Sequence, residues 1–187
     1  TDANAGAFAE GIGSDLPSSF FYLSLSNTVG GAIFHDGNLL PGDAFRCGEA
    51  GHMTLIPDGK PCYCGKTGCV DAYCSARLLS DLSGGRLEDF FLGLQQNNPD
   101  YRSVWDTYLK HLAVVINNLH MILDYDIVLG GYVGSFLSPW LDTIRRLVAE
   151  HNTFEDDGSF VKLCTYQTGA AAYGAAMDVM EEFLRTV

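Results

Sequence analysis

The stretch Cys47–Ser75, CGEAGHMTLIPDGKPCYCGKTGCVDAYCS, holds five of the six cysteines of the chain, one histidine and three carboxylates. Within it, Cys62, Cys64 and Cys69 form a C-x-C-x4-C cluster, and His52 lies ten residues before the first of them. Three sulfurs and one imidazole nitrogen suit a closed, tetrahedral zinc site. The sequence therefore predicts a structural zinc loop whose ligands are His52, Cys62, Cys64 and Cys69.

Two other interpretations of the cluster compete with zinc. Free cysteines often behave as small buried hydrophobic residues, and clustered cysteines can form disulfides. Gly65 and Gly68 lie between Cys64 and Cys69 and allow tight turns, which favours convergence of the three cysteines on one ion. In a chain with no secretory signal, clustered cysteines more often bind metal than form a disulfide framework. We expect Cys47 and Cys74, which lie outside the cluster, to be ordinary thiols.

The segments Gly48–Met53 and Cys62–Asp71 together resemble the signature of the ROK family (repressors, open reading frames, kinases). That family comprises bacterial sugar kinases and sugar-responsive repressors built on the actin-like ATPase fold. The resemblance implies that the histidine of G-E-x-G-H and the three cysteines bind zinc. It also implies that Glu49, His52 and Asp71 face the hydroxyl groups of a sugar, although the family usually has Glu where this chain has Asp71.

The first residues, TDANAGAFAEG, predict a helix, because alanine has the highest helix propensity. By themselves, Thr1 and Asp2 could simply cap that helix by accepting hydrogen bonds from its free N–H groups. The segment also resembles the N-D-A-N-A-A-A motif of the ROK family, which implies that Asp2 is the catalytic base of a kinase. Thr1 stands where the family usually has a sugar-binding Asn.

Apolar runs at 20–25 and 29–34 predict two antiparallel strands, with a second turn at 35–38. The first turn, Ser26-Asn27-Thr28, joins the two predicted strands. In an actin-like fold such a turn directs backbone N–H groups at ATP phosphates, and the resemblance makes Asn27 a nucleotide-binding candidate. ROK kinases resemble G-T-G-x-G-G-G here, whereas this chain replaces three of those glycines with Ser26, Thr28 and Ala32. This difference favours a non-catalytic relative over a kinase.

The remainder of the chain predicts alternating helices and strands. We expect helices at 70–82, 87–94, 99–122, 139–150 and 170–183, and strands at 126–131 and 160–165. Gly130 and Gly131 end the first of these strands, where the simplest interpretation is a tight turn. The resemblance places them in the adenosine motif and makes both nucleotide-binding candidates.

Composition limits the possible partners of the chain. The 187 residues are 47% hydrophobic and 18% charged, which is typical of a soluble globular protein. No apolar run approaches the roughly 20 residues that span a bilayer, and the sequence predicts a cytoplasmic protein. A net charge of -12 argues against direct binding of this segment to nucleic acid or to an anionic membrane.

These observations predict an α/β chain that forms one lobe of an actin-like ATPase (ribonuclease H-like) fold with an inserted zinc loop. We expect residues 1–187 to be a single ROK C-terminal lobe, a fragment of a longer chain that lacks the N-terminal lobe. The D-x-G-x-T phosphate loop of that other lobe does not occur in this sequence. Phosphoryl transfer requires such a loop and its magnesium, so we expect the segment alone to be nearly inert.

The predicted function is sugar binding, for a hexose or an amino-sugar, as the effector-sensing part of a sugar-responsive transcriptional regulator. Its DNA contacts would come only from a missing N-terminal module. The alternative is an ATP-dependent hexose kinase, glucokinase-like, with ATP and magnesium as cofactors, and a third possibility is a zinc-stabilised dimerisation domain. In each case we expect a homo-oligomer.

Overall fold

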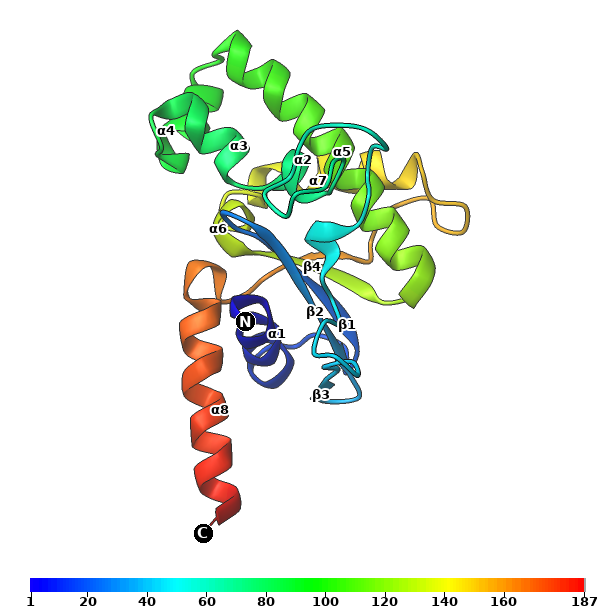
Figure 1. The fold of residues 1–187 in the computed structure, drawn as a ribbon, viewed down its shortest axis with the longest axis vertical. Coiled ribbons are helices and arrows are strands. Elements are labelled where there is room, and N and C mark those ends of the chain that lie inside the picture. Colours follow the sequence, from blue (N-terminus) through cyan, green and yellow to red (C-terminus); the bar gives the residue numbers. More distant parts are fainter. Residues whose placement is uncertain (187) are drawn as a thin grey trace.

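A five-stranded mixed sheet forms the centre of the protein, with strands in the order β3-β2-β1-β4-β5 (Figure 1). The computed structural model describes residues 1–186. β1 pairs antiparallel with β2 and parallel with β4, β2 pairs antiparallel with β3, and β4 pairs parallel with β5. The strand bounds are β1 Phe20–Leu25, β2 Val29–His35, β3 Asn38–Leu39, β4 Asp126–Gly130 and β5 Val161–Leu163.

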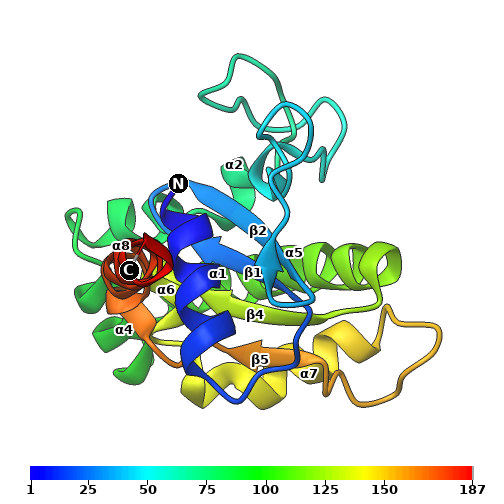
Figure 2. The same ribbon diagram turned by 90° about the horizontal axis from the view of Figure 1, so that it is seen from below.

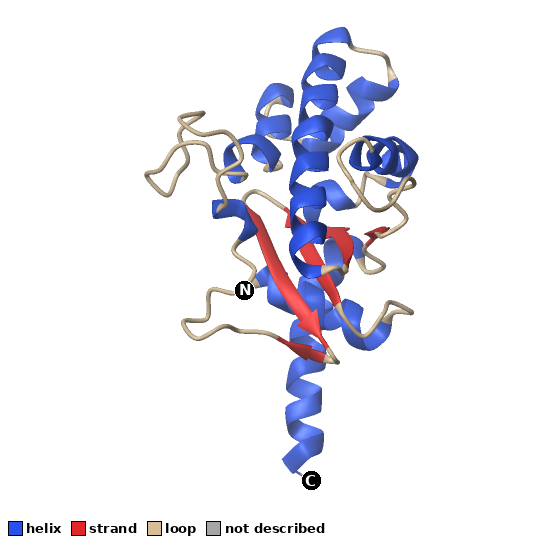
Figure 3. Ribbon diagram, turned by 90° about the vertical axis from the view of Figure 1, so that its right-hand side faces the viewer, coloured by secondary structure: helices blue, strands red, loops and turns tan. Residues whose placement is uncertain are grey.

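Helices cover both faces of this sheet (Figures 2 and 3). α1 and α8 lie together on one face, and α5 and α7 lie together on the other. The helix bounds are α1 Asp2–Gly13, α2 Asp71–Cys74, α3 Arg77–Ser80, α4 Leu87–Gln95, α5 Pro99–Leu123, α6 Gly131–Gly134, α7 Leu141–Ala149 and α8 Ala170–Thr186. Residues 1–186 also contain short 3-10 turns, at Ala50–His52, Asp81–Ser83, Ser138–Trp140 and Gln167–Gly169.

The central strand β1 is buried along its whole length because both faces of the sheet are covered. Its side chains alternate between two cores, as the two-residue period of a strand requires. Phe21, Leu23 and Leu25 pack in the larger core with α4, α5 and α7. Phe20 and Tyr22 pack in the smaller core beneath α1. The run FFYLSL lacks the polar-apolar alternation of a half-exposed strand for this reason.

The sequence predicted most of these elements. The strand at 20–25 and its antiparallel partner are confirmed, as are helices at the beginning of the chain, in α4 and in α5. α5 begins at Pro99, where the Asn98 side chain accepts hydrogen bonds from the N–H groups of Asp100 and Tyr101. The predicted helix at 139–150 begins two residues later, at Leu141, after a 3-10 turn. The short α6 was not predicted.

One prediction is wrong: residues 70–82 do not form a continuous helix. The chain makes one turn in α2, becomes extended at Ser75 and then makes a second turn in α3. The Ala76 N–H donates to the Ser26 carbonyl oxygen at 2.8 Å, and the Tyr108 hydroxyl donates to the Cys74 carbonyl oxygen at 2.7 Å. These contacts with the β1–β2 turn and with α5 replace helical hydrogen bonds, so tertiary anchoring interrupts a segment whose apolar spacing is helical.

α8 packs against α1 through small residues and then extends past it toward the C-terminus (Figure 1). At Gly174 the two backbones approach so closely that a Cβ atom would lie 1.8 Å from the Ala5 carbonyl oxygen. No helix in residues 1–186 is long and apolar enough to cross a membrane.

The contact at Gly174 leads to a stability prediction. Gly174→Val should lower the free energy of unfolding by roughly 1–3 kcal/mol, because an overpacked contact forces backbone movement. Urea denaturation of the purified protein measures this change. Ala176→Val is the matched control, since Ala176 is exposed on the same helix. Equal stability of the two variants would show that α1 and α8 do not pack this closely in solution.

Candidate functional site

A polar pocket of about 360 Å³ lies where the N-terminus of α1 meets the turn between β1 and β2. The loop between β3 and α2 projects from the same side of the protein (Figure 2). The pocket is lined by backbone and side chains of four separate segments: Thr1, Asp2, Ala3, Ser24, Ser26, Thr28, Val29, Gly30, Gly31, Glu49 and Tyr63. Two carboxylates that are far apart in the sequence, on Asp2 and Glu49, therefore line one cavity.

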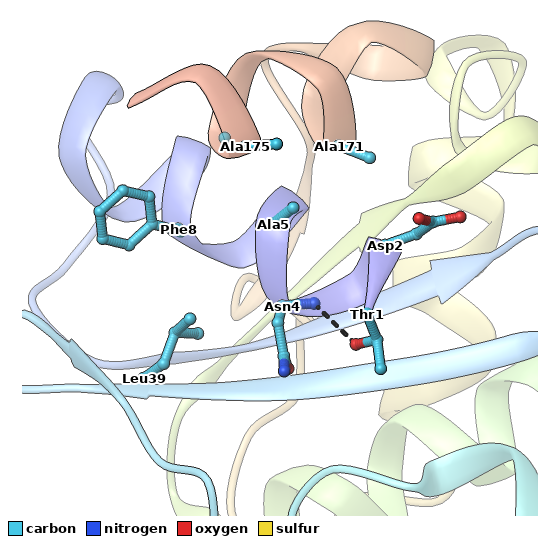
Figure 4. A pocket seen from close by; sticks show the side chains of 9 residues that line it. Thr1, Asp2, Asn4, Ala5, Phe8, Leu39, Ala171 and Ala175 are labelled. Atoms are coloured by element: carbon cyan, nitrogen blue, oxygen red, sulfur yellow. Dashed lines mark hydrogen bonds between the residues drawn. The ribbon is translucent and has the colours of Figure 1, made fainter. Parts of the chain in front are cut away.

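Asp2 is the first residue of α1, and its carboxylate does not cap that helix. The side chain of Thr1 takes this role by accepting a hydrogen bond from the Asn4 N–H at 3.2 Å. Figure 4 draws a neighbouring pocket between α1 and α8, and in it the Asp2 carboxylate projects from the first turn, away from the Thr1–Asn4 hydrogen bond. The Asp2 side chain is exposed to solvent. The structure thus leaves this carboxylate free to contact a ligand.

Glu49 reaches the pocket because two glycines place the loop backbone directly on β2. Gly48 has a φ of +85°, and a Cβ atom there would lie 2.5 Å from the Gly31 carbonyl oxygen. A Cβ atom on Gly51 would lie 2.1 Å from the Val29 carbonyl oxygen. Any larger side chain at either position would lift the loop from the strand. The two glycines of the G-E-A-G-H segment therefore fix the positions of Glu49 and His52.

The predicted metal ligands converge. One ligand atom from each of His52, Cys62, Cys64 and Cys69 lies within 4.8 Å of the others. The sulfurs of Cys64 and Cys69 are 3.7 Å apart, which matches the edge of about 3.8 Å of a tetrahedron with 2.3 Å zinc–sulfur bonds. Burial, followed by the nearby sulfurs, raises the pKa of the Cys69 thiol to about 12. A cation at the centre would counteract this shift by stabilising the thiolate.

Backbone contacts hold the cysteine loop in shape. The Cys62 N–H donates to the Lys66 carbonyl oxygen at 2.8 Å, and the Gly65 N–H donates to the Cys62 carbonyl oxygen at 3.0 Å. All six cysteines have free thiols, so the disulfide alternative is not realised. Cys47 and Cys74 lie outside the convergent set.

His52 and Asp71 contact the pocket indirectly. Asp71 is buried at the start of α2, where its Oδ1 atom accepts a hydrogen bond from the Val29 N–H at 2.6 Å. Val29 lines the pocket, so Asp71 holds part of its wall in place. His52 is exposed, and its Nε2 atom lies 3.3 Å from the hydroxyl of Tyr63. Neither His52 nor Asp71 is among the residues that line this pocket.

A second cavity, of about 80 Å³, adjoins Asp2 at the carboxyl ends of the parallel strands β1 and β4. Ligands of open α/β sheets commonly bind at this edge. Its lining comprises Asp2, Tyr22, Ser24, Ser26, Gly131, Tyr132, Gln167, Thr168, Ala170 and Ala171. Of the three nucleotide-binding candidates, Gly131 lies in this set. Gly130 packs against the Tyr22 hydroxyl, and Asn27 is exposed in the turn between β1 and β2.

A buried carboxylate on α1 holds one wall of the second cavity. Glu10 is fully buried, and its Oε1 atom accepts hydrogen bonds from the N–H groups of Thr165 and Tyr166 at 2.7 and 2.9 Å. The turn that follows these residues carries Gln167 and Thr168 into the cavity. α1 therefore both carries Asp2 and anchors the segment opposite it.

Sequence reasoning missed several residues of these cavities. Ser24, Gln167, Thr168 and Tyr132 belong to no motif and reach the cavity only through the packing of distant segments. Tyr63 had a local signal, because it lies between two predicted metal ligands and its orientation is therefore constrained. An aromatic side chain that is 67% exposed beside a polar pocket is the clearest omission.

The chain resembles known proteins along most of its length. The sequence profile described as "ROK family" matches residues 1–182. An N-acetylmannosamine kinase of Salmonella typhi is 30% identical over 186 residues, covering 94% of this chain and 62% of the kinase. The chain thus spans less than two thirds of the length of this relative.

Solved structures show the same fold. The ROK family glucokinase from Streptomyces griseus, in complex with glucose and AMPPNP, superposes with a TM-score of 0.76 at 22% identity, covering 94% of this chain and 65% of that one. A ROK family transcriptional regulator, a homologue of the E. coli MLC protein, gives 0.72 at 22% identity, covering 94% and 50%. The fold is the mixed α/β fold of ROK kinases, in the actin-like ATPase class. By its sequence profile and its fold, the chain belongs to the ROK family.

Proposed function

We propose that this chain binds a sugar, a hexose or an amino-sugar, in the pocket that Asp2 and Glu49 share. The observation that carries the proposal is the convergence of these two exposed carboxylates on one polar cavity. Ionised carboxylates only accept hydrogen bonds, and the hydroxyl groups of a sugar supply many donors. The names of the related proteins support this ligand class, because they include an N-acetylmannosamine kinase and a glucokinase bound to glucose.

His52 and Asp71 have supporting roles in this proposal. Asp71 fixes the Val29 backbone by its hydrogen bond, and we expect its remaining carboxylate oxygen to contact the sugar once the ligand is bound. His52 would present Nε2 to a sugar hydroxyl together with the Tyr63 hydroxyl. Nδ1 is then the nitrogen that is left for the metal, and metal-bound histidines usually use their second nitrogen in this way.

The metal in the cysteine loop is zinc in this proposal. Three thiolates and one imidazole with tetrahedral spacing match the preference of Zn²⁺, and four protein ligands leave no open position for catalysis. The ion would have a structural role. It would hold the loop that carries Tyr63 and, through His52, the segment that carries Glu49.

We propose further that residues 1–187 form one lobe of a longer protein, the C-terminal lobe of a ROK chain. This chain covers 62% of the length of the related kinase and 65% of the glucokinase structure. The part of a longer protein that corresponds to the uncovered residues would supply a second lobe opposite the pocket. Activity therefore belongs to the full-length protein.

Sugar phosphorylation is the first of two candidate roles that we propose for the full-length protein, and the position of Asp2 supports it. Asp2 lines both the sugar pocket and the smaller cavity at the strand ends. A carboxylate in this position can accept the proton of a sugar hydroxyl while the hydroxyl oxygen attacks the terminal phosphorus of ATP and ADP departs. ATP with magnesium would supply the phosphoryl group and neutralise its charge.

Sugar sensing without catalysis, in a transcriptional regulator, is the second candidate role. The turn Ser26-Asn27-Thr28 replaces glycines with side chains, and the Ser26 hydroxyl lies 3.3 Å from the Ser24 hydroxyl at the edge of the smaller cavity. These side chains occupy space that a closely approaching phosphate would need. DNA would then be contacted by a module outside this chain.

The two roles differ in a measurable way. In the full-length protein, Asp2→Asn should weaken sugar binding only a few-fold, because the amide keeps an acceptor oxygen. It should lower sugar-dependent ATP consumption by at least about a hundredfold if Asp2 is a base, the usual contribution of general-base catalysis. Calorimetry and a coupled ATPase assay across a panel of hexoses and N-acetylhexosamines measure the two quantities.

Asp15→Asn is the matched control, because Asp15 is exposed just beyond the other end of α1. ATP turnover by the wild type that is lost in Asp2→Asn assigns the kinase role. Sugar binding without turnover assigns the sensing role. A wild type that binds none of these sugars, or binding that survives Asp2→Ala combined with Glu49→Ala, would rule out the proposed pocket.

The metal site gives a second prediction. The purified protein should contain about one equivalent of zinc, and Cys64→Ser should lose most of it and lower the melting temperature, because metal binding energy contributes to folding. Elemental analysis and thermal denaturation measure both effects. Cys47→Ser, a half-buried thiol outside the ligand set, is the control and should retain zinc. A zinc content below half an equivalent in the wild type would reject the assignment.

A further inference from the structure

We propose that Tyr63 is a specificity-determining residue of the sugar pocket, whose ring stacks on the apolar C–H face of a bound pyranose. This inference rests on the proposed sugar-binding function. It specifies which part of the sugar Tyr63 recognises, the C–H face of the ring. It assigns the pocket to sugars in their cyclic form. An acyclic polyol with the same hydroxyl groups would not form this contact.

The ring of Tyr63 is available to a ligand. The side chain is 67% exposed although it belongs to the wall of the pocket. Its aromatic neighbour is His52, whose ring centroid lies 5.5 Å away at an interplanar angle of 61°. The two rings meet at a steep angle and not face to face, so this contact with His52 leaves at least one face of the tyrosine ring uncovered. A large apolar surface thus remains uncovered beside a polar cavity.

The position of the ring is fixed at two places. The backbone of Tyr63 lies between Cys62 and Cys64, which both belong to the metal-ligand set. The hydroxyl lies 3.3 Å from the Nε2 atom of His52, a third member of that set. A side chain held at its backbone and at its tip loses little additional conformational entropy when a ligand binds. The metal loop therefore preorganises this aromatic surface.

The pocket offers two kinds of surface, polar acceptors and an aromatic face, and a sugar ring can contact both. The carboxylates of Asp2 and Glu49 offer acceptors to hydroxyl groups. The π-face of Tyr63 carries partial negative charge and attracts the weakly positive C–H groups of a pyranose ring. A ring with hydroxyl groups at its edge and C–H groups on its face matches both. An axial substituent on that face would hold the ring away from Tyr63, so the contact distinguishes epimers.

The test measures sugar affinity in variants of the full-length protein. Calorimetry is performed with glucose, mannose, N-acetylglucosamine and N-acetylmannosamine, and with the acyclic polyol sorbitol. For the sugar that the wild type binds best, Tyr63→Ala should raise Kd roughly three- to tenfold, the range expected for one aromatic contact. Tyr63→Phe, which keeps the ring, should change Kd less than about twofold. The preference for that sugar over its epimers and over sorbitol should shrink in Tyr63→Ala.

Controls separate stacking from a loss of structure. Lys66→Ala alters an exposed residue of the same loop that does not line the pocket, and it should bind sugar like the wild type. Zinc content and melting temperature of each variant report whether the loop is intact. If Tyr63→Ala loses zinc, Tyr63→Leu retains the bulk of the side chain without a π-face and should show the same loss of affinity and selectivity.

The outcomes distinguish this inference from the function on which it rests. A wild type that binds a sugar, together with unchanged affinity and selectivity in Tyr63→Ala or in zinc-loaded Tyr63→Leu, overturns the role of Tyr63 and leaves the sugar pocket in place. Equal loss in Tyr63→Phe and Tyr63→Ala assigns the effect to the hydroxyl group and also overturns stacking. A wild type that binds none of the sugars overturns both proposals.

Discussion

The contact between the loop at Gly48–Gly51 and strand β2 is the constraint on which the candidate site depends. Two backbones touch there without intervening side chains, since a Cβ atom at either glycine would collide with a carbonyl oxygen of β2. This contact brings Glu49 to the pocket and His52 to the cysteines. Because interiors pack densely and transmit displacements, a shift at this contact would move the Glu49 carboxylate and the candidate metal ligand His52 together.

The sheet supplies the second organising feature. β1 and β4 run parallel and end at the same edge, and α1 begins beside that edge. Asp2 thereby borders both the larger polar pocket and the smaller cavity formed by turns. The buried Glu10 links the same helix to the turn across the smaller cavity. Helix α1 thus carries the Asp2 carboxylate and, through Glu10, also holds the wall of the smaller cavity that lies opposite it.

The cap of α1 and the segment 70–82 each had two possible sets of hydrogen bonds, and the structure shows which set forms. Thr1 and Asp2 were equally acceptable as caps from the sequence, and the structure uses Thr1, which leaves the Asp2 carboxylate exposed. Apolar spacing at 70–82 favoured a helix, but hydrogen bonds from Ala76 to Ser26 in the β1–β2 turn and from Tyr108 of α5 to Cys74 divide it into two turns. Local propensity is a weak determinant when buried partners from other elements compete for the same backbone groups.

The sequence by itself determined the family, the main strands and helices, and the histidine and three cysteines that converge as a candidate metal site. Each of these rests on a local signal: the spacing of three cysteines, a run of motif residues, or apolar periodicity over one element. Only the tertiary structure decided that Asp2 and Glu49 face one pocket, that Asp71 holds Val29, and that Tyr63 borders the cavity with an exposed ring. These relations join residues tens of positions apart, and their geometry is set by sheet register and by backbone contacts at glycines, which no local pattern specifies.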